Sequence, residues 1–295
     1  MNSEHNPHRG AEALLLITVL IWALNAPLVK YGIGQMDVFV FNAIRFIVAS
    51  SVIAALLFSR STWKTVQRGD WWVLIRLGLI TNVFYQLTFI FAFKLTTAGN
   101  GAVLMATSPL WTLLLNARLH HERVPRIAIV GSMVSLVGIA LMIVGSGKEF
   151  ELASGAIVGD ALALVAAFLW ALNTTMQKDA LQRYSSVQTM LVSVGVGAAC
   201  LSAAAVPSAI SFPWSQIHFT QWFVPVISGG LSIGIAYVMW ANGVRHIGPR
   251  KTGNYGNLIP VLAFVAASIL LKEPVTIYHV SGASLTVGGV WIARH

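Results

Sequence analysis

Residues 184–244 contain no Asp, Glu, Lys or Arg, and this uncharged stretch constrains the fold more than any other feature of the sequence. A helix needs about 20 mostly apolar residues to cross a bilayer, so the stretch is too long for a single crossing. Pro207, Pro213 and the pair Ser215-Gln216 divide it in two. Across the chain 56% of the residues are hydrophobic and 10% are charged, whereas soluble domains carry about 25% charged residues. The sequence therefore predicts a membrane protein.

Apolar windows long enough to span a bilayer recur along the whole chain. They predict an all-α membrane protein with ten transmembrane helices. Ten such helices leave no room for a soluble domain. The predicted spans lie at about 13–33, 37–58, 71–93, 97–117, 126–146, 155–178, 186–206, 219–244, 251–271 and 275–293.

The chain also contains an internal repeat. The string W-A-L-N begins at Trp22 and again at Trp170, 148 residues later. A second set of landmarks recurs after 151 residues, with Pro109, Glu122 and Val124 matched by Pro260, Glu273 and Val275. Self-similarity at a fixed period indicates a duplicated architecture. We therefore expect two related five-helix halves, residues 1–147 and 148–295.

The number of helices in each half decides how the halves insert. Five is odd, so the second half enters the membrane from the opposite side and the repeat is inverted. Fourteen of the 19 Lys and Arg residues then fall on the side of the N-terminus and four on the other, while Arg45 lies within a span. Positively charged loops stay in the cytoplasm, so both termini are expected there. Inverted repeats commonly build alternating-access transporters, with a substrate site near the midplane where the halves meet.

The end of the fourth span of each half carries the pattern L-x-x-E-x-V, at Leu119–Val124 and Leu270–Val275. With ten helices, a repeated W-x-x-N and a Pro before each Glu, the chain resembles the drug/metabolite transporter superfamily, and within it the EamA-type members. The resemblance covers nearly the whole chain. It implies export of amino acids, aromatic and other apolar ones among them, or of related metabolites across a bacterial inner membrane.

The repeated pairs Trp22/Asn25 and Trp170/Asn173 are the first candidates for substrate binding. A spacing of three residues puts both side chains of a pair on one helix face, and an amide in hydrocarbon needs a partner, so this face is expected to point into the bundle. In one reading the amides bind the carboxylate or ammonium of a substrate and the indoles wall its cavity. In the other, Asn joins helices and Trp fills space.

Further aromatic and uncharged polar residues recur in four other predicted spans. We expect them to line the same cavity, because small-molecule sites place a few polar groups among apolar walls and aromatic rings attract an ammonium group. These residues are Asn82, Tyr85, Gln86, Phe89, Met105, Trp111, Tyr237, Trp240 and Tyr255. Tryptophans near predicted helix ends are instead expected at the membrane–water interface, namely Trp63, Trp71, Trp72, Trp214, Trp222 and Trp291.

Three ionisable residues near or inside predicted spans are candidates for coupling or gating, because charges in a membrane are costly and often functional. Asp160 is either a proton site or a residue that caps a helix or pairs near the outer surface. Arg45 either binds a substrate carboxylate or reaches the interface along its apolar stem. His279 is expected to pack rather than to bind. Pro109 and Pro260 interrupt equivalent helices and either permit bending during gating or form static kinks.

Some function classes lack their signature in this sequence. There is no G-x-x-x-x-G-K-[S/T] loop for an ATP-driven motor and no H-E-x-x-H metal motif. We expect no enzyme activity, no cofactor, no metal and no nucleic-acid partner. The expected function is a secondary transporter that exports amino acids or related metabolites by alternating access, with a small-molecule substrate and membrane lipid as partners. Export of cationic drugs or of sugar and nucleotide metabolites, and a passive channel, are the alternatives.

Overall fold

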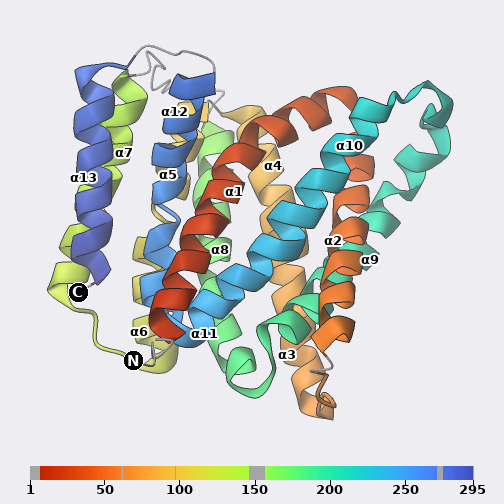
Figure 1. Ribbon diagram of the computed structural model, residues 1–295, viewed down its shortest axis with the longest axis horizontal. Coiled ribbons are helices and arrows are strands. Elements are labelled where there is room, and N and C mark those ends of the chain that lie inside the picture. The colour runs from red at the N-terminus through yellow and green to blue at the C-terminus, as the bar shows by residue number, and fades with distance from the viewer. Residues whose placement is uncertain (1–6, 61–62, 97, 146–156, 271–274, 295) are drawn as a thin grey trace, which may run out of the picture. The chain divides into compact units, whose positions relative to one another are not determined.

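The computed structural model shows a chain built from helices (Figure 1). Every regular element in the described ranges is helical, which confirms the expected fold class. Within the same part of the chain, eight helical segments are long and apolar enough to cross a membrane. The described ranges are residues 7–60, 63–96, 98–145, 157–270 and 275–294.

Two helices stand where the sequence predicts the ninth and tenth spans. These are α12 (Leu258–Leu270), with 13 residues, and α13 (Ile277–Arg294), with 18. They are not among the eight spans found by length and composition in the described ranges. The first eight predicted spans each overlap one of those eight segments.

The chain divides into two compact units, and neither unit is one half of the sequence. The first contains residues 1–83 and 177–246, and the second contains residues 84–176 and 247–295. Each unit therefore takes helices from both predicted halves. The predicted boundary between the halves, at residues 147 and 148, lies outside the described residues.

In the first unit, α2 (Val38–Arg60) is the central helix. It packs against α9 (Ser186–Ser211) and against the π-helical segment η3 (Ser228–Ile235). Asp37 caps its start, because Oδ1 accepts two backbone N–H groups at 2.9 and 3.1 Å. The unit also contains α1 (Pro7–Gln35), α3 (Arg68–Gly78), most of η1 (Leu79–Tyr85), the end of α8 (Ile157–Arg183), η2 (Trp214–Gln216), α10 (Phe219–Ile227) and the first part of α11 (Ala236–Tyr255).

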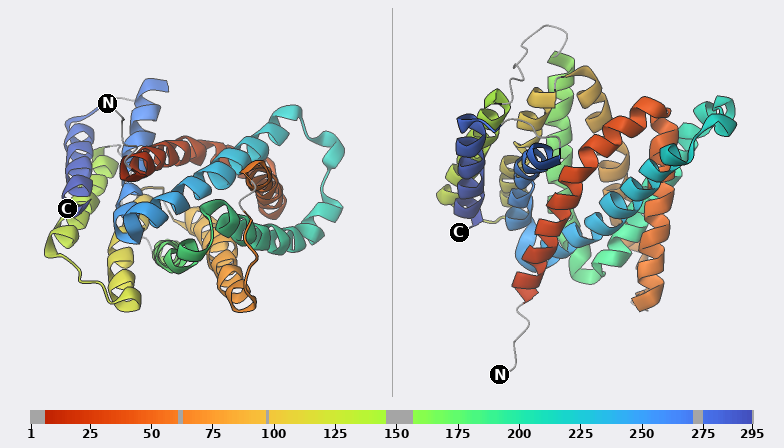
Figure 2. Two further views of the ribbon diagram at one scale, coloured as in Figure 1. Left: turned by 60° about the horizontal axis from the view of Figure 1, so that its bottom comes forward. Right: turned by 45° about the horizontal axis from the view of Figure 1, so that its top comes forward.

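In the second unit, the main contact joins α7 (Arg126–Gly145) to α13, which lie side by side in both figures (Figures 1 and 2). Most of α8, the end of α11 and α12 also belong to this unit. The remaining helices of the unit are α4 (Gln86–Leu95), α5 (Ala98–Met105) and α6 (Ser108–His120).

Glycines bring α7 and α13 into backbone contact. A Cβ added at Gly131 would lie 2.6 Å from the carbonyl oxygen of Gly289, and one added at Gly138 would lie 2.6 Å from that of Gly282. Residue numbers rise along one helix as they fall along the other, so the helices run antiparallel. Gly282 and Gly289 follow Gly131 and Gly138 by 151 residues, the register of the sequence repeat. The repeat therefore maps the contact of Gly131 with Gly289 onto the contact of Gly138 with Gly282, and the second contact onto the first.

Departures from regular α-helix also recur at equivalent places. The π-helical segments η1 and η3 begin 149 residues apart. The predicted fourth span is broken between α5 and α6, and the predicted ninth between Tyr255, the last residue of α11, and α12. Prediction from hydropathy does not detect these breaks, because the backbone hydrogen-bonding pattern changes while the residues stay apolar.

The boundary between the eighth and ninth predicted spans falls inside α11, at Gly248. Its backbone has φ 81° and ψ 162°, a conformation that essentially only glycine adopts. Pro249 follows and supplies no backbone N–H, as is common where a new helix starts. The predicted interruption between residues 244 and 251 is therefore a sharp kink at one residue.

Candidate functional site

Three of the predicted aromatic residues form one cluster in the first unit. Trp22 of α1 makes an edge-to-face contact with Tyr237, at 6.0 Å between ring centroids, and a tilted contact with Trp240 at 5.1 Å. Its indole N–H donates a 2.9 Å hydrogen bond to the carbonyl oxygen of Ser232 in η3. Tyr237 and Trp240 are buried and Trp22 is half-buried. The cluster is thus a fixed aromatic surface held between α1 and the helix that contains η3.

Ser232 lies in the string Gly230–Gly234, which has the letters G-x-S-x-G of a hydrolase nucleophile elbow. That elbow needs a sharp turn between a strand and a helix. Here the string lies within the π-helical segment, so its letters carry no hydrolase chemistry.

Arg45 lies two turns inside α2 and is only 4% exposed. Its Nη1 donates to Asn42 Oδ1 at 3.0 Å, and its Cζ lies 5.5 Å from the centre of the Phe41 ring. The segment η3 crosses its backbone, since a Cβ added at Gly229 would lie 2.4 Å from the Arg45 carbonyl oxygen. The same segment accepts the indole N–H of Trp22 at Ser232, three residues after Gly229. Arg45 therefore belongs to the neighbourhood of the Trp22 cluster.

The two predicted amides of this unit have different surroundings. Asn82 in η1 is fully buried, and its Nδ2 donates to the carbonyl oxygen of Ser193 at 2.8 Å and to Ser193 Oγ at 3.0 Å. This pairing joins η1 to α9. Asn25 is half-buried, and its Oδ1 has no hydrogen-bond partner among the residues that the structure describes.

A second aromatic cluster lies in the second unit. The ring of Trp170 in α8 is 5.1 Å from that of Tyr85, which is 5.7 Å from Phe89. Phe89 continues the row to Phe93 at 4.6 Å. The row follows one face of α4, at the spacing of three to four residues that helical neighbours require.

The other predicted residues of the second unit lie on several helices. The ring of Trp111 in α6 meets that of Phe168 in α8 edge-to-face at 5.6 Å, and its Nε1 has no hydrogen-bond partner among the described residues. Met105 is half-buried at the end of α5. Gln86, Asn173 and Tyr255 are buried.

The two aromatic clusters are related by the repeat. Trp170 follows Trp22 by 148 residues, and Tyr237 follows Tyr85 by 152. Each cluster joins a Trp from one half of the sequence to a Tyr from the other, and each lies within a single compact unit. The residues predicted to line a single cavity therefore form two equivalent sets, one in each unit.

Asp160 joins the start of α8 to the end of α4. Its Oδ1 accepts a hydrogen bond from the hydroxyl of Thr96. Gly159 lets the two backbones approach, since an added Cβ would lie 2.6 Å from the carbonyl carbon of Leu95. The carboxylate is half-buried and is paired with a hydroxyl of a neighbouring helix.

His279 caps the start of α13. Its Nδ1 accepts the backbone N–H of Thr276 at 3.1 Å, while its own backbone N–H donates to Thr276 Oγ1 at 3.4 Å. This exchange is a capping box in which His replaces the usual Glu. The ring is 4% exposed and stacks on Phe264 at 4.1 Å between centroids, as the packing interpretation of this residue expects.

The matched prolines lie at the beginnings of new helices. Pro109 occupies the first turn of α6, and Pro260 occupies the first turn of α12. Proline is tolerated there because the first-turn N–H groups lack intrahelical partners. Each proline therefore follows a break in its span and does not bend a continuous helix.

A polar network in the first unit was not expected from the sequence. Asp70 is 8% exposed and accepts hydrogen bonds from Arg183 Nη1 at 2.5 Å and from the Tyr184 hydroxyl at 2.6 Å. The hydrogen bond from Tyr184 to this carboxylate, together with desolvation, raises the pKa of the tyrosine. One signal was available, because Asp70 is the only acidic residue between Asp37 and Glu122.

The same network continues to the segment before α3. Gln188 Nε2 donates to the carbonyl oxygen of Lys64 at 2.5 Å, and the Lys64 N–H donates to Gln188 Oε1 at 3.0 Å. Arg245 Nη1 lies 3.4 Å from the carbonyl oxygen of Tyr184. The network fastens the turn between α8 and α9 to the start of α3 and to α11.

Residues 9–144 and 157–294 each match the EamA-like transporter family. The chain belongs to this family. The two matches cover nearly the whole chain, one in each half, and confirm both the resemblance and the repeat expected from the sequence.

Proteins from several organisms resemble the chain over almost its full length. An uncharacterized transporter of Archaeoglobus fulgidus is 28% identical over 95% of both chains. A Salmonella typhimurium protein named "probable amino-acid metabolite efflux pump" is 24% identical over 95% of this chain and 93% of its own. A crystal structure with 21% identity has a TM-score of 0.81 and covers 97% of this chain and 96% of its own, which shows a shared fold.

An EamA-like transporter exposes a multi-pass helical surface to lipid, and the tryptophans expected at the interface are accessible. Trp222 is half-buried and stacks on Trp214 at 5.7 Å between centroids. The other members of the expected set are between 41% and 62% exposed, namely Trp63, Trp71, Trp72, Trp214 and Trp291.

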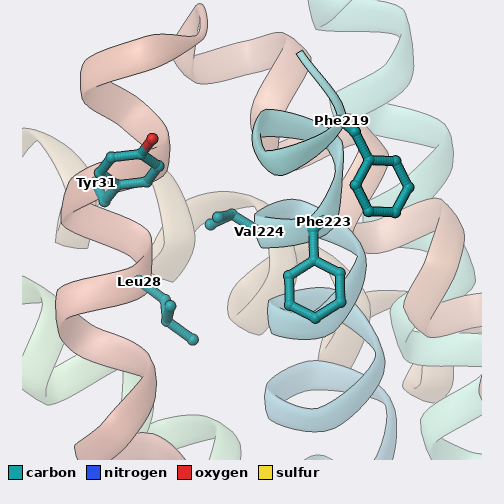
Figure 3. Close-up of a pocket in the computed structure, with 5 residues that line it drawn as sticks. All are labelled: Leu28, Tyr31, Phe219, Phe223 and Val224. Atoms are coloured by element: carbon teal, nitrogen blue, oxygen red, sulfur yellow. The ribbon is translucent and has the colours of Figure 1, made fainter. Parts of the chain in front are cut away.

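An apolar groove of about 460 Å³ opens between α1 and α10 in the first unit (Figure 3). Its lining includes no residue of the predicted site. Apart from the Tyr31 hydroxyl the lining is hydrocarbon, so the groove offers little to orient a polar substrate. The lining residues are Leu28, Tyr31, Phe219, Phe223 and Val224.

Proposed function

We propose that this chain is a secondary transporter that exports amino acids with aromatic or other apolar side chains, or related metabolites, by alternating access. It would sit in a bacterial inner membrane with ten spans in two inverted five-helix repeats and both termini in the cytoplasm. The gradient of the substrate or of protons would drive transport, without a cofactor or an enzymatic step.

The observation that carries this proposal is the pair of equivalent aromatic clusters, around Trp22 and around Trp170. Aromatic faces bind apolar side chains well, and they attract an ammonium group. Two related clusters give the substrate equivalent contacts in the two halves of a transport cycle. The name of the Salmonella typhimurium relative, an amino-acid metabolite efflux pump, points to the same substrate class.

Two further observations support the proposed topology. The helices α7 and α13 occupy equivalent positions in the repeat and run antiparallel in the second unit, as an inverted repeat requires. The helices α12 and α13 stand where the ninth and tenth spans are predicted. A span assembled from short helices with a break between them is common in transporters of this kind.

Efflux from reconstituted liposomes tests the function. Purified protein is inserted into vesicles loaded with one labelled amino acid at a time, and release is compared with that from vesicles without protein. Trp22→Ala and Trp170→Ala are each expected to slow efflux of phenylalanine several-fold, because each removes one aromatic wall. Trp72→Ala, at a residue that is 60% exposed, serves as the matched control and is expected to leave the rate unchanged.

The same vesicles separate the alternatives. Release of none of the amino acids above the empty-vesicle rate would defeat the proposal. Release of a lipophilic cation or a nucleotide sugar in its place would favour the other substrate classes. Single-channel conductance in a planar bilayer would identify a passive channel, because an alternating-access carrier shows none.

A further inference from the structure

We propose that Arg45 binds the carboxylate of the transported molecule, so that substrates are organic acids or zwitterions and not amines or neutral compounds. The inference rests on the proposed transport function and specifies which part of the substrate the first unit recognises. It assigns the role of binding residue to a side chain on α2, a helix that supplies none of the residues of the two aromatic clusters.

The first argument is the charge itself. Arginine stays protonated in proteins, and its planar guanidinium matches the two oxygens of a carboxylate. Arg45 is 4% exposed and lies two turns inside an apolar helix. A permanent charge at such a position is costly to maintain, and intramembrane charges of this kind mark substrate and ion pathways.

The second argument is the set of groups around the guanidinium. Asn42 orients it through the 3.0 Å bond to Nη1, and the ring of Phe41 lies 5.5 Å from Cζ. Ser228 precedes the glycine that touches the Arg45 backbone. It is 1% exposed, and its Oγ has no hydrogen-bond partner among the described residues. A buried hydroxyl next to the contact point offers a second donor for an anionic ligand.

The third argument is the charge of the neighbouring elements. The helices α9 and α10 and the segment η3, which all pack against α2, come from residues 184–244, where no Asp or Glu occurs. These elements therefore do not repel an anionic ligand. In the same unit, the carboxylate of Asp70 is already bound to Arg183 and Tyr184.

The fourth argument links the cation to the aromatic cluster. The segment η3 touches the Arg45 backbone at Gly229 and, three residues later, accepts the indole N–H of Trp22 at the carbonyl oxygen of Ser232. One unit thus combines a carboxylate-binding cation with an aromatic surface for an apolar group. A zwitterionic amino acid with an apolar side chain presents both features in one small molecule.

A pair of ligands that differ only at the carboxylate tests the inference. Efflux of labelled L-phenylalanine from proteoliposomes is competed with unlabelled L-phenylalanine or with L-phenylalaninamide, which keeps the ring and the ammonium group but has no carboxylate. The wild-type protein is expected to prefer the acid by about tenfold or more, the effect of a lost charge-assisted hydrogen bond. In R45Q the two competitors are expected to become equivalent, whereas R45K, which keeps the charge without the planar fork, falls between.

Arg76→Gln is the matched control. Arg76 belongs to the same unit and lies 5.9 Å from the centre of the Trp72 ring, but it is exposed. Its replacement is expected to leave the preference for the acid unchanged. Each variant is first checked by size-exclusion chromatography, and the acid-to-amide ratio of the wild-type protein tests the inference even where R45Q does not fold.

The outcomes distinguish this inference from the proposed function. Equal competition by the acid and the amide in wild-type vesicles, or a preference that survives in R45Q, overturns the role of Arg45 and leaves amino-acid export standing. Transport of 3-phenylpropionate but of no amino acid, with a preference over its amide that depends on Arg45, refutes amino-acid export and supports the role of Arg45. Transport of amines or sugars alone overturns both.

Discussion

Replacing a single glycine in α13 is expected to separate the two helices that hold the second unit together. A Cβ added at Gly289 would lie 2.4 Å from the backbone nitrogen of Ser135 and 2.6 Å from the carbonyl oxygen of Gly131. Both atoms belong to the backbone of α7, so no side chain can rotate to make room. The helices must move apart along the interface, and the packing they share is lost.

The cost of Gly289→Ala follows from this geometry. Forcing a methyl group into a close-packed contact costs about 1–3 kcal/mol. For a chain of this size each kcal/mol corresponds to about 2–4 °C in Tm, so the melting temperature is expected to fall by roughly 2–12 °C. Separation would also stretch the 3.0 Å bond from Asn257 Nδ2 to Ser135 Oγ.

The neighbouring residue provides the control. A Cβ added at Gly288 meets no atom within 4 Å, and alanine is favoured over glycine in a helix by up to about 1 kcal/mol. Gly288→Ala is therefore expected to leave Tm unchanged or to raise it. Thermal stability of the detergent-purified variants by fluorescence-detected size exclusion measures both. Equal Tm values for the two variants would refute the proposed helix contact.

The repeat extends this prediction to α7. Gly138 is the residue that the 151-residue register equates with Gly289, and an added Cβ there would lie 2.6 Å from the carbonyl oxygen of Gly282. Gly138→Ala is expected to cost as much as Gly289→Ala. Because both changes separate the same helices, the double variant should be less destabilised than the sum of its parts. Fully additive losses would show that the two contacts are independent.

Gly248→Ala is expected to lower stability by about 1–3 kcal/mol through its backbone conformation alone, because an added Cβ meets nothing within 4 Å; Gly195→Ala, in equally open space within a helix, should not. Tyr184→Phe should lower Tm below a pH of about 10. Because the raised pKa of Tyr184 favours the neutral phenol in the folded state, the difference in Tm from the wild-type protein should shrink as the pH rises further. A difference in Tm that does not depend on pH would contradict this. Asn82→Leu should cost about 1–3 kcal/mol by removing both buried hydrogen bonds to Ser193, measured as loss of Tm, and no loss would show that these bonds do not stabilise the contact between η1 and α9.

The sequence predicts the helical fold well because the hydropathy of a segment indicates whether lipid or water surrounds it. Eight predicted spans correspond to segments long and apolar enough to cross a membrane. It predicts the interruptions within spans poorly. The predicted span 97–117 is two helices, and nothing in Ala106-Thr107 distinguishes that break from its apolar surroundings except Pro109 two residues later. The π-helical segment η1 contains neither Gly nor Pro, so composition offers no signal for it.

Side-chain partners were predictable only where the repeat or helical spacing supplied the pairing. Trp22 and Trp170 stood out because their string occurs twice, and Tyr85 and Phe89 because they share a helix face. The contact of Gly131 with Gly289 requires knowledge that α7 and α13 are neighbours, and no local pattern contains it. The carboxylate of Asp70 was missed for the same reason, since both of its partners lie more than 100 residues away.

The packing of equivalent helices explains why the compact units cut across the halves of the sequence. α2 packs on α9, and α7 packs on α13, so each unit is built around one pair of helices that the repeat relates. Each half of the sequence contains one member of each pair and no partner for either. Its apolar packing faces, including the glycines of α7, can be covered only by the other half. The duplication thus produces two units that each need both copies of the repeat. The aromatic clusters follow the same pattern, because each joins a Trp of one copy to a Tyr of the other.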